Sequence, residues 1–128
     1  MIQFTLLFAA TLGCLAIIFG AFGAHALKKI LNEDQLKSFE TGVKYQMYHA
    51  LVLLIIGFNF KLETASEKYM AYSFMLGIPL FSFSIYGLVI SSAKNKKLKF
   101  LGPITPLGGL LLIVGWSFLC YNILNMTF

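Results

Sequence analysis

The sequence predicts an all-α integral membrane protein, an antiparallel four-helix bundle, from how few charges it has and where they lie. Only 12% of its 128 residues are charged, 59% are hydrophobic, and the mean hydropathy is +0.81. An ordinary soluble domain carries about 25% charged residues to cover its surface. The ten lysines and five acidic residues fall into three short stretches, which leave residues 1–27, 45–60, 69–93 and 100–128 uncharged. We therefore expect one transmembrane domain over residues 1–128, and the soluble globular classes are excluded.

The uncharged segments set the expected spans. A helix rises about 1.5 Å per residue, so about 20 residues cross a hydrocarbon core about 30 Å thick. This predicts spans at about residues 4–27, 43–62, 69–93 and 106–126. The second uncharged segment is the shortest, and it spans only if Lys44 and Lys61 extend their ammonium groups to the lipid headgroups.

The lysines predict the orientation. Eight of the ten lie in the first and third loops, among them Lys94, Lys96, Lys97 and Lys99, while Lys61 and Lys68 lie in the second. The positive-inside rule then places loops 28–44 and 94–99 in the cytoplasm and both termini outside. Lysines beside a membrane contact anionic lipid headgroups. The chain has no arginine, and much of its surplus charge is a topology signal, so we expect no nucleic-acid partner.

Small residues recur along the first span. Gly13, Ala16, Gly20 and Ala24 follow one another every three or four residues, which lets a second helix backbone approach closely. Both an intramolecular seam and a homodimer face fit this pattern.

The first loop predicts more than a linker. Asn32 is a good N-cap, and Leu36, Phe39, Val43 and Met47 follow it at helical spacing. We expect a short cytoplasmic interfacial helix that starts here and continues into the second span.

Prolines mark the third and fourth spans. Pro79 predicts a kink near the middle of the third. In the fourth, Thr105 is expected as N-cap and Pro106 as the first helical residue, because the N–H that proline lacks would have no partner there.

Three motifs together indicate a family. They are Gly20–Leu27 (GAFGAHAL), Phe39–Gln46 (FETGVKYQ) leading to His49, and Gly102–Gly109 (GPITPLGG) followed by Gly115-Trp116. In this order they resemble the small four-helix membrane proteins of the domain of unknown function 423 family. Its bacterial members are of the YgdD and YwdK type, and eukaryotic relatives are similar to transmembrane protein 256. The resemblance implies a bacterial inner-membrane protein with four helices, and because the family has no established activity it implies no catalytic residue.

The two histidines are the sharpest candidates for chemistry. His25 and His49 lie about 4.5 and 7.5 Å inside the cytoplasmic boundary, counted from Lys28 and Lys44. Ionisable groups at such depth are costly and suggest function. They could be structural, line a ligand or headgroup pocket, or form a proton-relay or metal pair. The candidate polar site comprises His25, His49, Tyr45, Gln46, Tyr48, Thr105 and Trp116. Trp116 is expected to face the bundle, with Ser82 or Ser84 as the partner of its indole N–H.

The residues absent from the spans discriminate between functions. No Asp, Glu or Arg lies within them, whereas an ion-coupled transporter usually needs an intramembrane carboxylate. The chain also lacks a catalytic triad, a metal-binding cluster or a phosphate loop, so we expect no enzyme, metal or cofactor. We predict a non-enzymatic accessory, assembly or lipid-interacting protein. The alternative is a small-solute transporter or channel with a polar site near the cytoplasmic face, and a redox or metal-linked enzyme is a weaker third. Membrane lipids are the expected partners, with a larger membrane complex or a homo-oligomer left open.

Overall fold

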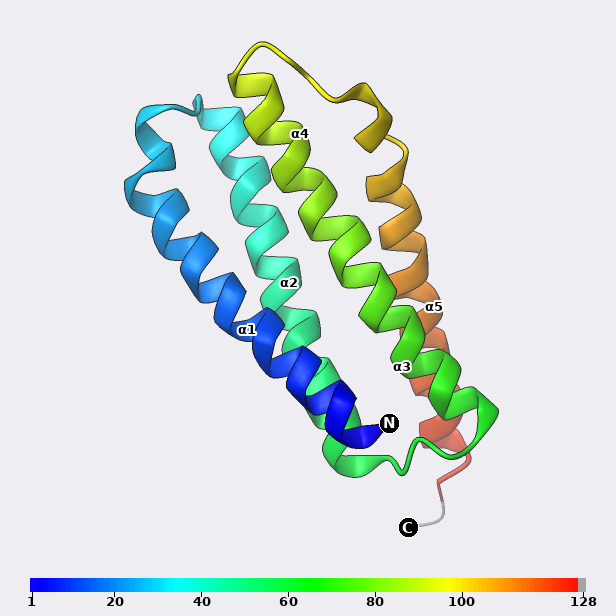
Figure 1. The fold of residues 1–128 in the computed structure, drawn as a ribbon. Helices are drawn as coiled ribbons and strands as arrows, with labels where there is room; N and C mark the ends of the chain where they lie inside the picture. The colour runs from blue at the N-terminus through cyan, green and yellow to red at the C-terminus, as the bar shows by residue number, and fades with distance from the viewer. Residues whose placement is uncertain (127–128) are drawn as a thin grey trace.

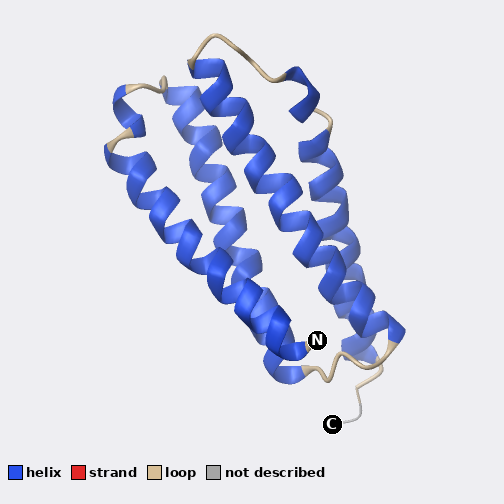
Figure 2. Cartoon of the chain, viewed as in Figure 1, coloured by secondary structure: helices blue, strands red, loops and turns tan. Residues whose placement is uncertain are grey.

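The computed structural model describes residues 1–126, and within them four long helical segments lie side by side (Figure 1). They are α1 (Ile2–His25), α2 (Glu33–Asn59), a continuous segment formed by α3 (Ala65–Ile78), η2 (Pro79–Phe83) and α4 (Ser84–Ala93), and α5 (Ile104–Leu124). The short 3₁₀ turns η1 (Leu27–Lys29) and η3 (Lys99–Leu101) lie in the connections, which are otherwise short loops (Figure 2). Successive segments run in opposite directions. The first and third loops therefore share one end of the molecule, and the second loop, the N-terminus and the end of α5 share the other (Figure 1).

Three helical stretches within residues 1–126 are long and apolar enough to cross a membrane: Ile2–Lys29, Ala65–Ala93 and Lys99–Leu124. α2 is not among them, because Lys44, Gln46 and His49 lower the hydropathy of its middle. The second span was expected to end at residue 62, and this is wrong. α2 ends at Asn59, and the chain then turns through Leu62, whose φ of 54° lets its side chain fold back into the core.

The start of α2 confirms the predicted N-cap. Asn32 accepts from the backbone N–H of Gln35 at 2.8 Å, and the Gln35 side chain accepts from the Asn32 N–H at 3.1 Å. This reciprocal capping box satisfies two backbone donors that the helix itself leaves without partners. The amphipathic stretch before the predicted second span is thus the first part of one uninterrupted helix that continues to Asn59.

α1 packs along α2 with a seam of small residues that differs from the predicted one. Ala16 is buried, and a Cβ built on Gly20 would meet Val43 of α2 at 3.4 Å, as expected of a close approach. Gly13, in contrast, has no neighbour within 4 Å of such a Cβ, and Ala24 is exposed. The other buried positions of α1 are Thr5, Ala9, Leu12 and Gly23. The seam therefore follows a face rotated slightly from the one chosen by residue size alone.

The remaining helices pack around the proline. Pro79 opens the π-helical turn η2 within the third segment, so the backbone widens at the place where a kink was expected. α5 packs mainly on α3 and on this turn, while α2 contacts α3, η2 and α4 and so joins the two helix pairs. At Gly108 of α5, a Cβ would lie 2.3 Å from the backbone nitrogen of Phe81. Only glycine allows this approach of α5 to the π turn.

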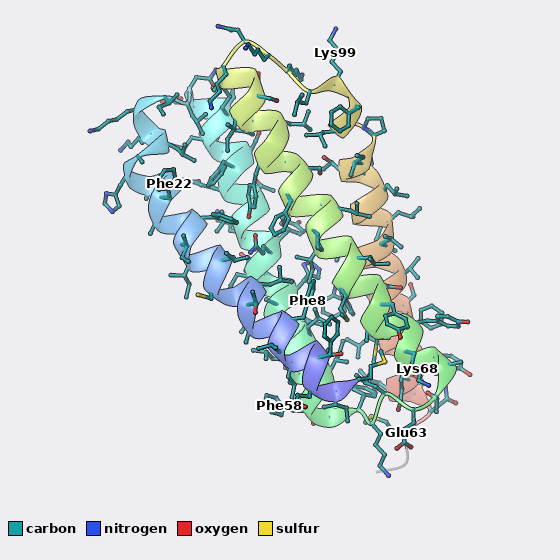
Figure 3. All side chains as sticks on the ribbon, in the orientation of Figure 1. Phe8, Phe22, Phe58, Glu63, Lys68 and Lys99 are labelled. Atoms are coloured by element: carbon teal, nitrogen blue, oxygen red, sulfur yellow. The ribbon has the colours of Figure 1, made fainter. Side chains whose placement is uncertain are left out.

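The surface is apolar between the two ends. Phe22 and Phe58 project outward from α1 and α2, whereas Lys99 lies at one end and Glu63 and Lys68 at the other (Figure 3). Exposed large apolar side chains extend over the helices, with Phe58 at 75% and Leu124 at 84%. Extended apolar surface of this kind marks contact with a membrane or another protein.

Candidate functional site

One polar contact among the predicted site residues joins α2 to α5. His49 of α2 is only 6% exposed. Its Nδ1 lies 2.7 Å from the carbonyl oxygen of Tyr45, and the indole Nε1 of Trp116 donates to its Nε2 at 3.2 Å. Nε2 can accept only when it carries no proton, so the two bonds fit a neutral imidazole protonated at Nδ1. Both ring nitrogens are thus used inside the protein.

Trp116 does not have the partner that the sequence suggested. Ser82 donates to the carbonyl oxygen of Gly42 at 2.7 Å, and Ser84 pairs with Thr105 at 2.6 Å, so neither contacts the indole. The side of α5 that carries Trp116 faces α2, where the Nε2 of His49 accepts the indole N–H. The residue is 45% exposed, which places the ring at the rim of the helix assembly rather than at its centre.

The two histidines lie far apart, so they do not form the pair that was one of the three alternatives for them. Gln46 of α2 donates to the carbonyl oxygen of Leu12 on α1, which fixes the register of the two helices. His49 lies three residues beyond Gln46 on α2, whereas His25 is thirteen residues beyond Leu12 on α1, about 20 Å toward the loop. The prediction measured depth from Lys44, but α2 begins eleven residues before it. His25 is exposed at the last residue of α1.

Gln46 forms a second, separate polar centre. It is fully buried, its Nε2 donates to the Leu12 carbonyl at 2.8 Å, and its Oε1 accepts from the Tyr86 hydroxyl at 2.7 Å. This links α1, α2 and α4 through one side chain. Sequence reasoning missed Tyr86 and the bond from Ser82 to Gly42. Ser82 and Tyr86 are four residues apart on the third predicted span, which puts both on one helix face, and this spacing was the signal that could have found them.

Thr105 does not cap the fourth long helix. α5 begins at Ile104, two residues before the predicted first helical residue Pro106, with Pro103 in the cap position and no side-chain cap. The fixed φ of proline already suits the helix there, at −69°. The Thr105 hydroxyl instead bonds Ser84 of α4. Of the remaining candidates, the Tyr45 ring stacks on His49 with centroids 5.9 Å apart, whereas Tyr48 is exposed and takes no part.

A groove separates α2 from α5 on the side where Tyr45, His49 and Trp116 lie. It contains a hollow of about 510 Å³ with Phe81 of the π turn among its walls. Apolar surface predominates, and the α5 wall extends from Pro106 through Gly109 to Trp116. The groove is wide because α5 packs against α3 and the π turn rather than against α2.

A larger hollow of about 800 Å³ continues this groove toward the first and third loops. The two share Thr41 of α2 and Pro106 of α5 as lining residues. Lys97 and Lys99 line the larger hollow, whereas Lys94 and Lys96 of the same loop do not. Of the four lysines predicted to contact headgroups, Lys97 and Lys99 therefore line this hollow, and Lys94 and Lys96 lie outside it.

Metal ligands do not gather in the described part of the chain. Within residues 1–126, no three side chains of His, Cys, Asp or Glu are grouped so that they could hold a metal ion.

Comparison with known proteins identifies relatives over most of the chain. The family model described as "Protein of unknown function (DUF423)" matches residues 19–109. A UPF0382 membrane protein of Staphylococcus aureus (strain bovine RF122 / ET3-1) is 40% identical over 105 residues, which cover 82% of each chain. One of Haemophilus influenzae is 33% identical over 86% of this chain and 85% of its own. The UPF0382 inner membrane protein YgdD of Escherichia coli K12 is 31% identical over 97% of this chain and 92% of its own. No solved structure matches.

These matches confirm the family that the three motifs indicated. The chain belongs to the DUF423 family, whose relatives named above are membrane proteins and whose function is not known.

Proposed function

We propose that this protein is a non-enzymatic, four-span bundle of the inner membrane that holds a membrane lipid between α2 and α5. The observation that carries the proposal is the groove that ends at His49 and Trp116. An accessory or assembly role in a larger complex would use the same lipid-exposed surface. We infer that α2 also crosses the membrane, because its most polar central side chains, Gln46 and His49, are buried and bonded to neighbouring helices.

The dimensions of the groove suit one acyl chain. Its α5 wall extends over eleven residues from Pro106 to Trp116, a rise of about 15 Å along the helix. This is half of a hydrocarbon core about 30 Å thick, the depth of one leaflet. The walls are mostly apolar along this length, and both nitrogens of His49 are occupied by Tyr45 and Trp116, so the imidazole presents no unpaired nitrogen to a hydrocarbon chain.

The same contacts weigh against the alternative, a pathway for a small polar solute. Such a pathway needs polar side chains that face a cavity and are free to bind. Gln46 bonds both Leu12 and Tyr86, and no fully buried side-chain nitrogen or oxygen in the described residues lacks a partner. The interior polar groups are therefore used to join helices.

Retention of lipid tests the proposal. The protein, extracted in mild detergent, should retain phospholipid detectable by native mass spectrometry, and the Gly109→Phe variant should lose most of it. A Cβ on Gly109 would make ordinary contacts of 3.6 and 3.7 Å with the Phe81 ring, so the backbone accepts it while the larger ring fills the groove. Gly13→Phe is the matched control, because Gly13 lies on α1 with open space beside it.

A second measurement, tryptophan quenching, tests the proposal even if the Gly109→Phe protein is too unstable for extraction with its lipid. Trp116 is the single tryptophan, so brominated acyl chains quench it both from the groove and from the surroundings of its exposed ring, and weaker quenching in Gly109→Phe than in Gly13→Phe reports loss of lipid from the groove. Equal retention and equal quenching in Gly109→Phe and Gly13→Phe would refute the proposal, as would a wild-type protein that retains no lipid.

The orientation is proposed with loops 28–44 and 94–99 in the cytoplasm. A single cysteine at Lys97, in a chain with Cys14 and Cys120 replaced by alanine, should resist a membrane-impermeant thiol reagent added to intact cells. A single cysteine at Lys68 should react. The opposite labelling pattern would reverse the assignment.

A further inference from the structure

The end of the groove near the first and third loops differs in chemistry from its apolar part. Besides Lys97 and Lys99, the larger hollow is lined by the carboxylate-bearing residue Asp34 and by four hydroxyl residues, Ser38, Thr41, Ser92 and Thr105. Its volume of about 800 Å³ exceeds that of the apolar hollow. The combined cavity is thus amphipathic along its length, with hydroxyl and charged groups at the loop end and aromatic and aliphatic groups at the other.

The loop that carries the lysines is held in place. Asn95 takes a left-handed conformation with φ of 56°, and the backbone N–H of Lys96 donates to the Ser91 carbonyl at 2.9 Å. The Ser91 hydroxyl accepts from the backbone N–H of Leu98 at 3.1 Å. Lys97 lies between these two anchored positions and Lys99 directly follows them. These backbone contacts hold the loop in which Lys97 and Lys99 line the hollow, whereas Lys94 and Lys96 of the same loop do not line it.

The charges of the hollow favour an anion. Two lysines and one aspartate among the lining residues leave one net positive charge. A phosphodiester carries one negative charge, and lysine binds phosphate as a mobile point charge. Asp34 adds an acceptor for a hydroxyl or amine elsewhere on the same ligand.

We infer that the lipid of the α2–α5 groove is an anionic glycerophospholipid, with its phosphate at Lys97 and Lys99 and one acyl chain extending toward Trp116. This rests on the proposed function and specifies its ligand. The polar hollow and the apolar hollow meet at Thr41 and Pro106, so a headgroup and a chain of one molecule occupy both. A free phosphate would use only the polar part.

Two charge-matched double variants test the inference. Lys97→Gln/Lys99→Gln removes the lysines that line the hollow, and Lys94→Gln/Lys96→Gln removes two lysines of the same loop that do not. Each removes two of the five net positive charges, so general attraction to an anionic surface weakens equally in both. The proteins are exchanged in detergent into equimolar phosphatidylglycerol and phosphatidylethanolamine of identical acyl chains, and bound lipid is measured by native mass spectrometry.

We expect the wild-type protein to prefer phosphatidylglycerol. Lys97→Gln/Lys99→Gln should lose about tenfold or more of that preference, whereas Lys94→Gln/Lys96→Gln should keep it. Total bound lipid and helicity show that the variants remain folded. Equal losses in the two double variants, or a wild-type protein without preference, overturn the headgroup inference while lipid binding itself stands. Displacement of phosphatidylglycerol by millimolar inorganic phosphate also overturns it, in favour of a free-anion site. If the wild-type protein binds no lipid of either kind, the proposed function fails as well.

Discussion

Replacing Gln46 by leucine should weaken the joint between α1, α2 and α4. The side chain is fully buried, donates to the Leu12 carbonyl at 2.8 Å and accepts from the Tyr86 hydroxyl at 2.7 Å. Leucine has a similar shape but forms neither bond, and the Tyr86 hydroxyl loses the acceptor seen here. An unsatisfied buried group costs about 1–3 kcal/mol, and hydrogen bonds between membrane helices contribute about 0.6 kcal/mol on average and up to about 1.7. We therefore expect Gln46→Leu to lower the free energy of unfolding by about 1–2 kcal/mol.

A double-mutant cycle isolates the bond from Tyr86. Tyr86→Phe leaves the Gln46 oxygen without its donor and should cost about 1 kcal/mol. Gln46→Leu/Tyr86→Phe removes both partners, and replacing both by apolar groups of similar shape costs little beyond the loss of the Leu12 bond. The double variant should therefore be more stable than the sum of the single losses predicts, by about 1 kcal/mol.

The assay is reversible unfolding in mixed micelles with increasing sodium dodecyl sulfate, followed by circular dichroism. Ser117→Ala is the control, because the exposed Ser117 hydroxyl bonds only the Ile113 carbonyl of its own helix and should contribute almost nothing. If the single losses simply add in the double variant to within about 0.3 kcal/mol, the Tyr86 hydroxyl does not bond Gln46 in the membrane and the reasoning is wrong.

Two further predictions follow from the packing of α5. Gly108→Ala should strongly destabilise the protein, because a Cβ at Gly108 would lie 2.3 Å from the Phe81 backbone. Gly109→Ala should be nearly neutral, because a Cβ there meets only the edge of the Phe81 ring at 3.6 Å. Thermal denaturation in detergent measures the difference, and similar melting temperatures for the two variants would contradict this geometry. The bond from Trp116 requires a neutral His49, so it is present at high pH and lost once acidification protonates the imidazole. The tryptophan fluorescence should change in that transition, and a change that persists in His49→Phe would exclude His49 as its source.

Helix positions could be predicted closely because they depend on local chemistry. The capping box at Asn32 and Gln35 and the disturbance at Pro79 follow from residues near in sequence. The end of α2 could not be predicted in this way. Leu62 leaves the helix to enter the core, and that choice depends on helices elsewhere in the chain. The predicted start of α5 was two residues too late, because Pro103 and Pro106 both have a φ that suits the first turn of a helix.

The candidate site was predicted in composition but not in pairing. His49, Trp116 and Tyr45 do lie together, whereas His25 lies about 24 Å from His49 along the helix axes, toward the first loop. Depth along each helix was counted from lysines, and only the bond from Gln46 to Leu12 shows how α1 and α2 are set against each other. The sequence shows which polar residues lie in the spans, but it does not show which residues on other helices they bond.

The sequence by itself determined that the chain suits a membrane, and it showed where its helical segments lie and which loops share an end. Those properties depend on residues that are close in sequence, through the charge and hydropathy of each segment and the capping of each helix. Only the tertiary structure decided that α5 packs on α3 and the π turn and so leaves a groove beside α2, and that Lys97 and Lys99 border it while Lys94 and Lys96 do not. The physical reason is that close approaches at Gly77, Gly108 and Gly115 hold α5 against the third helical segment. An approach between residues far apart in sequence depends on packing rather than on local pattern.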